Sequence, residues 1–316
     1  MTAALASRMS ALGLGAAPIG NLYSTIDDAA ARAAVDAAWA GGVRVFDTAP
    51  HYGLGLSERR LGRALAARPR DEYVVSTKVG RLLVPNPTPS GTDLASGFDV
   101  PDDLTRVRDY SRDGVLRSLE SSLRRLRLDR IDIVYVHDPE DFMALALAQA
   151  VPALLDLRDQ GVIGAVGVGM NLVAPLRRFV REYALDAVMV AGRWTLADRS
   201  AEVLLGECAA AAVTVVAAAP FNSGLLAKDW PPDGAYFDYA PASPARLAQA
   251  RALARACQNH GVALPHAALR FPLRHPAVAC VVAGMRTPGQ VRQDVAWMRD
   301  PLSDEFWAAV DHWAAG

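Results

Sequence analysis

The sequence predicts an α/β protein built as a (β/α)8 TIM barrel. Short, apolar, β-branched segments alternate with amphipathic segments rich in Ala and Arg from about residue 27 to the C-terminus. This alternation is typical of parallel strands joined by right-handed helical crossovers. An open doubly wound sheet gives the same alternation, but such a sheet binds dinucleotides at a GxGxxG motif after its first strand. The sequence has no such motif there, which favours the closed barrel.

The N-terminal segment is expected to form a small β-hairpin before the first helix. Gly and Pro punctuate the two short runs ALGLG and APIGN within residues 11–21. Asp27 or Asp28 then caps the first helix, and Gly41 with Gly42 signals its C-terminal end. The hairpin is therefore predicted to precede the repeating pattern of strands and helices.

Seven barrel strands are visible as apolar runs, and the eighth is inferred. Residues 262–270 are a candidate for it, although VALPHAALRF has the composition of a helix. No change in composition marks a second core, so residues 1–316 are expected to form one domain. The seven runs are VRVFDT (43–48), YVVSTK (73–78), IDIVYVH (131–137), VIGAVGVG (162–169), LDAVMVA (185–191), VTVVAAA (213–219) and AVACVVAG (277–284).

Two long segments interrupt the alternation. Residues 81–110 are rich in Pro, Gly, Ser and Asp and directly follow the strand that carries Lys78. Residues 221–244 mix turn formers with aromatic residues, among them Trp230, Tyr236, Phe237 and Tyr239. Either segment can be a tolerated surface insertion or a lid over a site. Because both follow strands at the face where barrel enzymes carry their chemistry, we expect substrate and cofactor loops at the C-terminal face.

The composition excludes several classes of protein. The 33 basic and 34 acidic residues leave no surplus charge for binding nucleic acid. Cys208, Cys257 and Cys280 are odd in number and lack the close spacing of metal ligands, which favours free thiols in a reducing compartment. The sequence shows neither a signal peptide nor an apolar stretch of ~20 residues. We therefore expect a cytoplasmic protein that needs no metal and binds neither nucleic acid nor a membrane.

Four polar residues follow apolar runs at the ends of the predicted strands. They are Asp47 and Tyr52 in FDTAPHYG, Lys78 in VVSTKVG, and His137 in IDIVYVHDPED. A tyrosine has a pKa near 10 and acts as an acid or base only when a nearby cation such as Lys78 stabilises its phenolate. Asp47 would anchor the lysine, and His137 would hydrogen-bond a substrate oxygen. Such a set can move a proton at a carbonyl or an alcohol.

With these flanking motifs, the sequence resembles the aldo-keto reductase family over roughly residues 11–298. Members of that family are (β/α)8 barrels that transfer hydride to or from a nicotinamide cofactor. The resemblance implies that Asp47, Tyr52, Lys78 and His137 are the catalytic aspartate, tyrosine, lysine and histidine of the family.

The same resemblance implies a cofactor site. In AVGVGMN, Asn171 corresponds to a residue that holds the nicotinamide carboxamide, while Met170 replaces the usual serine. In RWTL, Trp194 is similar to the aromatic residue that stacks on the nicotinamide ring. AAPFNSGLL resembles the pyrophosphate loop, and GMRTPGQVRQD resembles the adenosine-binding stretch, which alone would suggest a Thr-capped surface helix. The residues implied in these two stretches are Phe221, Ser223, Gly224 and Leu225, followed by Gly284, Arg286, Thr287, Gln290 and Asp294.

Asp138 points to one branch of the family, because many members carry an aromatic residue directly after the histidine. With the long segment after Lys78, the sequence is similar to the aldose 1-dehydrogenase branch, whose substrates include L-fucose and D-threo-aldoses. A polar rim suits a polyhydroxylated substrate, since hydroxyls need partners when they leave water. The predicted substrate contacts are His51 and Asp138.

The reaction implied by this branch is oxidation of the C1 hydroxyl of a cyclic aldose to a lactone. The expected cofactor is NAD or NADP, with NAD favoured, since Arg286 can contact either a 2′-phosphate or the ordinary adenosine phosphates. The expected partner is a small sugar or aldehyde, and the sequence specifies no oligomeric state. Three alternatives stay open, namely a general aldehyde or carbonyl reductase, a pyridoxal dehydrogenase, and a regulatory subunit that only binds the cofactor.

Overall fold

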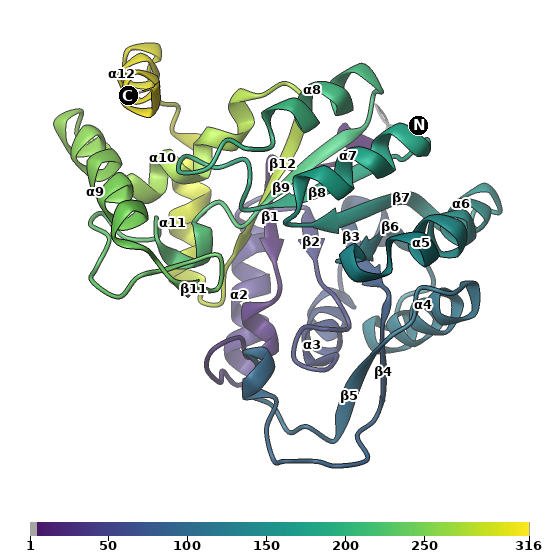
Figure 1. Cartoon of the computed structure of the whole chain (residues 1–316). Coiled ribbons are helices and arrows are strands. Elements are labelled where there is room, and N and C mark those ends of the chain that lie inside the picture. The colour runs from purple at the N-terminus through teal and green to yellow at the C-terminus, as the bar shows by residue number, and fades with distance from the viewer. Residues whose placement is uncertain (1–4, 316) are drawn as a thin grey trace.

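The computed structural model describes residues 5–315 of the chain. Within them, eight parallel strands close into a barrel in the order β1, β12, β9, β8, β7, β6, β3 and β2, with helices outside (Figure 1). The predicted (β/α)8 barrel is therefore confirmed. The strands are β1 (Leu12–Gly15), β2 (Val45–Asp47), β3 (Val74–Val79), β6 (Ile131–His137), β7 (Ile163–Met170), β8 (Ala187–Ala191), β9 (Thr214–Ala218) and β12 (Val278–Gly284).

The predicted N-terminal hairpin is wrong, because its first half is the missing eighth strand. β1 pairs in parallel with β12 on one side and with β2 on the other, as in Leu12 opposite Val281. The second half of the predicted hairpin forms a short 3-10 helix at Pro18–Gly20. Four residues with two glycines carry little strand propensity, and the two neighbouring strands supply the pairing that fixes the conformation. Residues Leu264–Arg270 form a helix, as their composition indicated.

Helices cover the outside of the barrel in an order that follows the chain. The carboxylate of Asp27 accepts a 2.7 Å hydrogen bond from the backbone N–H of Ala30, and Gly41 follows the last residue of α2, so the predicted limits of the first helix are confirmed. The helices are α2 (Asp28–Ala40), α3 (Leu56–Leu65), α4 (Arg112–Leu126), α5 (Met143–Leu145), α6 (Val151–Asp159), α7 (Val173–Glu182), α8 (Glu202–Ala210), α9 (Pro244–Asn259), α10 (Leu264–Arg270), α11 (Pro288–Arg299) and α12 (Asp304–Ala315).

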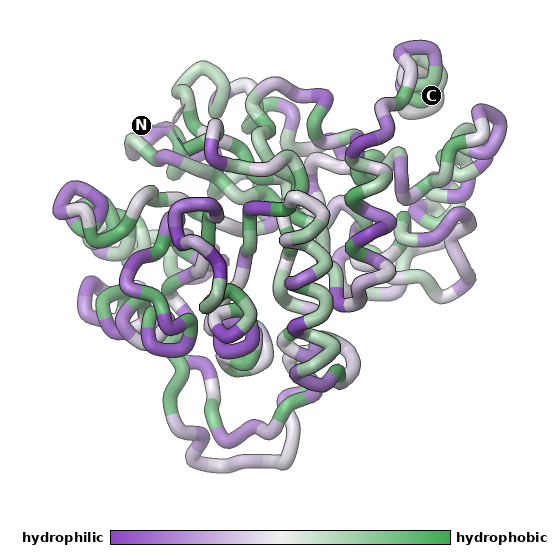
Figure 2. The backbone as a smooth tube through the Cα atoms, turned by 180° about the vertical axis from the view of Figure 1, so that it is seen from behind, coloured by the Kyte–Doolittle hydropathy of each residue, from purple (hydrophilic) through white to green (hydrophobic). Residues whose placement is uncertain are grey.

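The apolar core has two main parts. Alternate strand residues, among them Val74, Ile133, Tyr135 and Met189, fill the inside of the barrel. A larger layer lies between the strands and the helices. Hydrophobic and hydrophilic residues accordingly alternate along the outer helices (Figure 2). Across residues 5–315, no helix combines the length and the apolar character that crossing a membrane requires.

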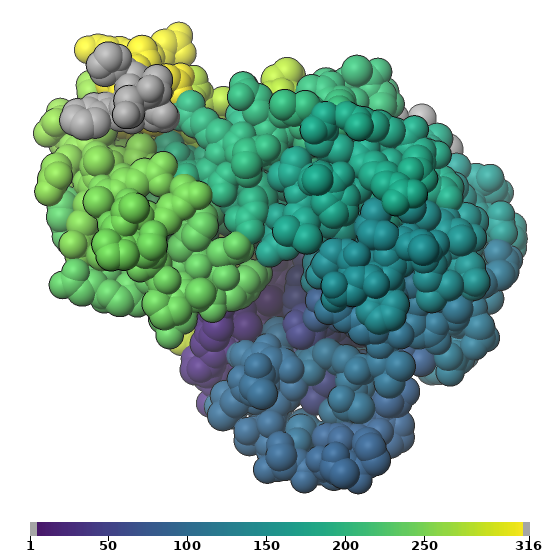
Figure 3. Space-filling model, viewed as in Figure 1, coloured from purple at the N-terminus to yellow at the C-terminus, as the bar shows by residue number. Residues whose placement is uncertain are grey.

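The two irregular segments form loops that follow barrel strands. Residues 81–110 contain the antiparallel pair β4 (Arg81–Pro85) and β5 (Leu104–Arg108), which extends away from the barrel (Figure 1). Residues 221–244 contain the short antiparallel pair β10 (Tyr236–Phe237) and β11 (Ala240–Pro241). The surface is hollowed between the blue and the green parts of the chain, with purple N-terminal residues on the floor (Figure 3).

Candidate active site

Asp47 and Lys78 form a buried ion pair at the ends of the neighbouring strands β2 and β3. Lys78 Nζ lies 2.8 and 2.9 Å from the two carboxylate oxygens of Asp47 and donates a further 2.9 Å bond to the carbonyl oxygen of Thr48. The hydroxyl of Ser76 donates to Asp47 Oδ1 at 2.7 Å. The side chains of the pair are only 2% and 4% exposed. The ammonium group is therefore fixed in position and remains charged.

Tyr52 lies in the turn between β2 and α3 and directs its hydroxyl at this ammonium group. Its Oη is 3.2 Å from Lys78 Nζ. Gly53, with φ of 60°, lets the turn pass close to the preceding loop, because a Cβ at this position would lie 2.2 Å from the carbonyl oxygen of Gly20. The tyrosine ring stands edge-on to His137, with 6.2 Å between the ring centroids and an interplanar angle of 89°. The turn thus places the phenol between a cation and an imidazole.

His137 is the last residue of β6 and completes the group of four. Its side chain is 7% exposed, and its Nδ1 has no hydrogen-bond partner within the part of the chain that the structure describes. The hydroxyl of Tyr110 donates to the backbone carbonyl oxygen of His137 at 2.6 Å. The four residues predicted from the sequence therefore lie together at the C-terminal ends of β2, β3 and β6.

Burial and the fixed charges shift the protonation of these groups. Burial raises the pKa of Tyr52 above its usual value of 10.0, and the positive charge of Lys78 offsets only part of this rise. Burial alone would lower the pKa of Lys78, but Asp47 and Tyr52 outweigh it and raise that pKa above its usual range. Burial, followed by the charges of Arg81 and Lys78, lowers the pKa of His137 well below 6.5. Near neutral pH the site thus contains a phenol, an ammonium group and a neutral imidazole.

The two predicted substrate residues lie beside this group. The His51 ring centroid is 6.0 Å from that of His137, and its Nδ1 is buried without a partner among the described residues. Burial, then the charge of Arg81, lowers the pKa of His51 to about 2. Asp138 Oδ2 lies 3.4 Å from His137 Nε2 and is also paired with Arg81. Asp138 has a left-handed backbone with φ of 44°, which is costly for a residue other than glycine and frequent at functional sites.

Two residues predicted to contact the cofactor follow the neighbouring strands β7 and β8. Asn171 follows β7, and its side-chain amide makes no hydrogen bond to the described residues. Trp194, predicted to stack on the nicotinamide ring, lies in the core instead. It is 7% exposed, its indole N–H donates to the Pro272 carbonyl oxygen at 3.1 Å, and its ring packs 5.3 Å from that of Phe271. The physical reason is that the chain turns at Gly192, with φ of 68°, and the large apolar ring is buried.

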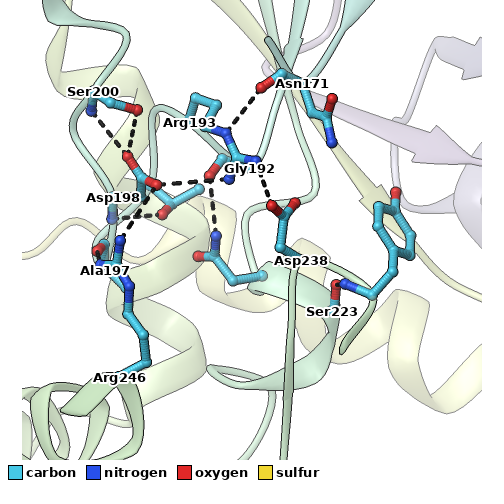
Figure 4. A network of polar contacts seen from close by, with 12 residues as sticks. Asn171, Gly192, Arg193, Ala197, Asp198, Ser200, Ser223, Asp238 and Arg246 are labelled. Carbon is cyan, nitrogen blue, oxygen red and sulfur yellow. Dashed lines mark hydrogen bonds and ion pairs between the residues drawn. The ribbon is translucent and has the colours of Figure 1, made fainter. Parts of the chain in front are cut away.

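Arg193 occupies this rim and was not foreseen from the sequence. Its Nε donates to the backbone carbonyl oxygen of Asn171 at 2.8 Å, and its Nη2 lies 2.5 Å from a carboxylate oxygen of Asp238 (Figure 4). A third contact, of 3.6 Å, reaches Asp198. Arg193 therefore connects the end of β7 to the 221–244 segment. The available signal in the sequence was an arginine two residues after the apolar strand β8. The family resemblance, in contrast, points to the neighbouring Trp194.

The stretch predicted to hold the pyrophosphate has an unusual backbone. Asn222, Ser223 and Gly224 have φ values of 45°, 57° and 94°, so three consecutive residues are left-handed. The backbone N–H groups of Asn222, Gly224 and Leu225 donate to carbonyl oxygens within this loop at 3.0–3.2 Å, so these three donors are already paired. Phe221 is half-buried, and Leu225 is fully buried in the core, so the side chain of Leu225 is not available to a ligand.

Side chains of this loop tie it to its neighbours. The amide nitrogen of Asn222 donates to the Gly192 carbonyl oxygen at 3.1 Å, while its buried Oδ1 has no partner in residues 5–315. The hydroxyl oxygen of Ser223 accepts a 3.0 Å bond from the backbone N–H of Tyr239 (Figure 4). The orphaned amide oxygen and the left-handed backbone fit a site for a polar ligand.

The stretch predicted to hold the adenosine moiety is the start of α11. Gly284 ends β12 and is exposed. The Thr287 hydroxyl accepts a 3.2 Å bond from the backbone N–H of Gln290, and the Gln290 side chain accepts a 3.3 Å bond from the backbone N–H of Thr287. This capping box satisfies both side chains within the helix start.

Arg286 and Asp294 differ in their surroundings. The guanidinium group of Arg286 donates to the hydroxyl of Ser24. Asp294 is 6% exposed, and burial raises the pKa of its carboxyl to about 7. A buried carboxyl of this kind can act as a hydrogen-bond donor when it is protonated.

A parallel barrel that carries a Tyr–Lys–Asp–His group at the C-terminal ends of its strands has the construction of an oxidoreductase that uses a nicotinamide cofactor. The chain belongs to the aldo/keto reductase family, whose sequence model matches residues 11–315.

Two characterised relatives and one solved structure support this assignment. The chain is 46% identical to a D-threo-aldose 1-dehydrogenase from a Pseudomonas species, covering 98% of this chain and 95% of that protein. It is 38% identical to a pyridoxal 4-dehydrogenase from Microbacterium luteolum, covering 96% and 93%. The holo form of an aldo-keto reductase from Bacillus halodurans superimposes with a TM-score of 0.76 at 25% identity, covering 96% and 92%.

Proposed function

We propose that this enzyme oxidises the C1 hydroxyl of a cyclic aldose, such as L-fucose or a related D-threo-aldose, to the lactone. The observation that carries the proposal is the position of the Tyr52 hydroxyl, 3.2 Å from Lys78 Nζ and edge-on to His137. This geometry handles a proton at a carbon–oxygen bond. The identity to an aldose 1-dehydrogenase over nearly the whole length of both proteins supports the substrate class.

Tyr52 carries the proton in the proposed mechanism. In the oxidation direction, the Tyr52 phenolate accepts the proton of the C1 hydroxyl, and the Lys78 ammonium stabilises that phenolate. Asp47 keeps the ammonium charged and in place. The neutral imidazole of His137 hydrogen-bonds the C1 oxygen and orients it toward the phenol. In the reverse direction, the neutral phenol of Tyr52 donates its proton to a carbonyl oxygen.

The residues on the opposite rim fit a nicotinamide cofactor. The free amide of Asn171 would hold the carboxamide, the left-handed loop at Asn222–Gly224 would receive the pyrophosphate, and Arg286 and Asp294 would face the adenosine. When bound, the nicotinamide ring supplies the acceptor for the hydride of C1. We favour NAD over NADP, because the guanidinium group of Arg286 is already engaged by the hydroxyl of Ser24.

His51 and Asp138 would bind the sugar hydroxyls. The unpartnered Nδ1 of His51 and the carboxylate of Asp138 provide hydrogen-bonding groups beside His137. A hydroxyl left without a partner on leaving water would cost about 1–3 kcal/mol, so such groups favour a polyol over a simple aldehyde. We also propose that the chain acts as one domain in a reducing, cytoplasmic compartment, which agrees with its three buried free thiols.

A substrate panel tests the proposal. The purified enzyme should reduce NAD with L-fucose or D-arabinose faster than with pyridoxal, and should reduce methylglyoxal slowly with NADH. Pyridoxal is a specific competitor, because a pyridoxal 4-dehydrogenase is 38% identical to this chain. Faster oxidation of pyridoxal would overturn the sugar assignment, and faster aldehyde reduction would indicate a general reductase. Quenching of cofactor fluorescence without turnover of any panel compound would indicate a binding subunit.

A further inference from the structure

The β4–β5 hairpin presents three arginines on one face. Arg81 is paired with Arg108, and Leu83 is paired with Arg106. Because side chains alternate across a strand, Arg106 and Arg108 share a face of β5, and the pairing puts Arg81 on that same face. We call residues 81–110 the clamp segment. Its arginines reach two different loops of the site.

Arg106 holds the loop that carries Tyr52. Its Nη2 donates to the backbone carbonyl oxygen of His51 at 2.8 Å, and its guanidinium group forms a two-pronged ion pair with Asp93 at 2.8 and 2.5 Å. The two charged side chains are 12% and 10% exposed. A pair with Asp93 alone would add little net stability when buried. The planar guanidinium fork, however, fixes the direction of the donor that reaches His51.

Phe98 of the clamp segment packs directly against the same loop. Its ring is 2% exposed and lies 6.1 Å from the Tyr52 ring and 5.2 Å from the His51 ring. Arg106 Cζ lies 5.8 Å from the centre of the Phe98 ring. The phenol of Tyr52 is thus supported on one side by the clamp segment and faces Lys78 with its hydroxyl.

The other end of the clamp segment holds the loop that carries His137. Arg108 donates to the backbone carbonyl oxygen of Asp138 at 2.9 Å, and Arg81 pairs with the Asp138 carboxylate. The Tyr110 hydroxyl lies 2.6 and 2.8 Å from the carbonyl oxygens of His137 and Asp138. One inserted segment therefore contacts the backbone on both sides of the reacting position.

We propose that the clamp segment fixes Tyr52 against Lys78 and His137, and that Arg106 is the positioning residue on the Tyr52 side through its bond to the His51 carbonyl oxygen. The kinetic part rests on the proposed function, because it assumes that Tyr52 carries the proton. Displacement of the phenol by about 1 Å would lower turnover by about tenfold or more, since proton transfer depends on contact geometry. Loss of the contact with Lys78 would also leave the phenolate less stabilised.

The test compares R106Q, R106K and D93N with R112Q. Arg112 is a matched control, because it begins α4 and its side chain forms an exposed ion pair with Asp156 of α6. R106Q should lower kcat for aldose oxidation by about tenfold and change KM for NAD by less than about twofold. Because the reaction uses the Tyr52 phenolate, kcat for oxidation rises at alkaline pH, and R106Q should move this alkaline rise to higher pH. R106K should recover part of kcat, and R112Q should match the wild-type enzyme. Thermal melts verify that each variant is folded.

D93N separates positioning from a simple charge effect. D93N keeps the positive charge of Arg106 but removes the carboxylate that fixes its guanidinium group. If Arg106 acts by positioning, the alkaline rise of kcat should therefore move to higher pH in D93N. If Arg106 acted only through its charge, removal of the Asp93 carboxylate would stabilise the phenolate and move the rise to lower pH. That lower-pH result, or wild-type kinetics in R106Q, would overturn the proposal.

A titration that needs no turnover separates a failure of the positioning role from a failure of the proposed function. If the wild-type enzyme oxidises no sugar, ultraviolet titration of the Tyr52 phenolate, taken as the difference from Y52F, still tests the clamp without turnover. The Tyr52 phenolate should then form at higher pH in both R106Q and D93N than in the wild-type protein. An unchanged titration in both variants would reject the positioning role.

Discussion

Replacement of Asp47 by asparagine tests the buried ion pair that organises the site. The carboxylate accepts two bonds from Lys78 Nζ, at 2.9 and 2.8 Å, and one from the Ser76 hydroxyl at 2.7 Å. An asparagine keeps one acceptor oxygen but turns an amide NH2 group toward the ammonium or the hydroxyl. The D47N variant would therefore leave the positive charge of Lys78 buried without a counter-charge.

The expected cost is large because both side chains of the pair are almost completely buried, at 2% and 4% exposure. Loss of one partner of such a pair costs about 3–5 kcal/mol of unfolding free energy, or roughly two to four orders of magnitude in the folding equilibrium. Domains typically have only about 5–15 kcal/mol in total. Burial would then lower the pKa of Lys78, and the neutral amine would no longer stabilise the Tyr52 phenolate.

The assay is urea unfolding followed by tryptophan fluorescence, together with kcat for aldose oxidation. D47N should lower the unfolding free energy by about 3–5 kcal/mol and reduce kcat by about a hundredfold or more. The double variant D47L/K78M removes both charges and should recover more than half of the lost stability but none of the activity. A loss below about 1 kcal/mol in D47N, or a double variant less stable than D47N, would refute the ion-pair reasoning.

Three further predictions follow from the same structure. Because burial raises the pKa of Tyr52 above 10.0, aldose oxidation by the phenolate should accelerate as the pH rises from about 8 to 10, while carbonyl reduction by the neutral phenol should change by less than about twofold; an oxidation rate that is flat over this range would contradict the assignment. Because Arg286 is engaged by Ser24, Arg286→Ala should change KM for NAD and KM for NADP by similar factors in steady-state kinetics; a rise in KM for NADP about tenfold larger than that for NAD would show that the guanidinium contacts a 2′-phosphate and would contradict the preference for NAD. Gly62→Ala should destabilise the fold by about 1–3 kcal/mol in urea unfolding, because the new Cβ would lie 2.1 Å from the Leu126 carbonyl oxygen. Gly206→Ala on α8 is the matched control, because a Cβ there would meet no neighbouring atom within 4 Å. Equal stability of the two variants would contradict the close packing of α3 and α4.

The barrel and the group of four residues could be predicted because their signals are local. Asp47 and His137 are the last residues of buried barrel strands, and Lys78 is the last but one of its strand. Parallel strands of a barrel bring such residues to one face. Helix limits set by side-chain caps, as at Asp27, were equally readable.

The remaining features depend on tertiary contacts that a sequence pattern does not carry. β1 is a four-residue, glycine-containing strand whose conformation is set by two neighbours distant in sequence. Trp194 was placed at the cofactor by resemblance, but the turn at Gly192 and the acceptor at Pro272 put it in the core. Arg106 and Arg193 act on backbone carbonyl oxygens, which any residue supplies, so nothing in the sequence marks those partners.

The rate at which Tyr52→Phe oxidises an aldose is the most direct measurement of the central claim. The substitution removes only the hydroxyl that lies 3.2 Å from Lys78 Nζ, while the ring keeps its packing against Phe98. With L-fucose and NAD, kcat should fall by about 10² or more, with NAD affinity by fluorescence quenching unchanged within about twofold. Turnover close to that of the wild-type enzyme would show that Tyr52 does not carry the proton and would contradict the proposed mechanism.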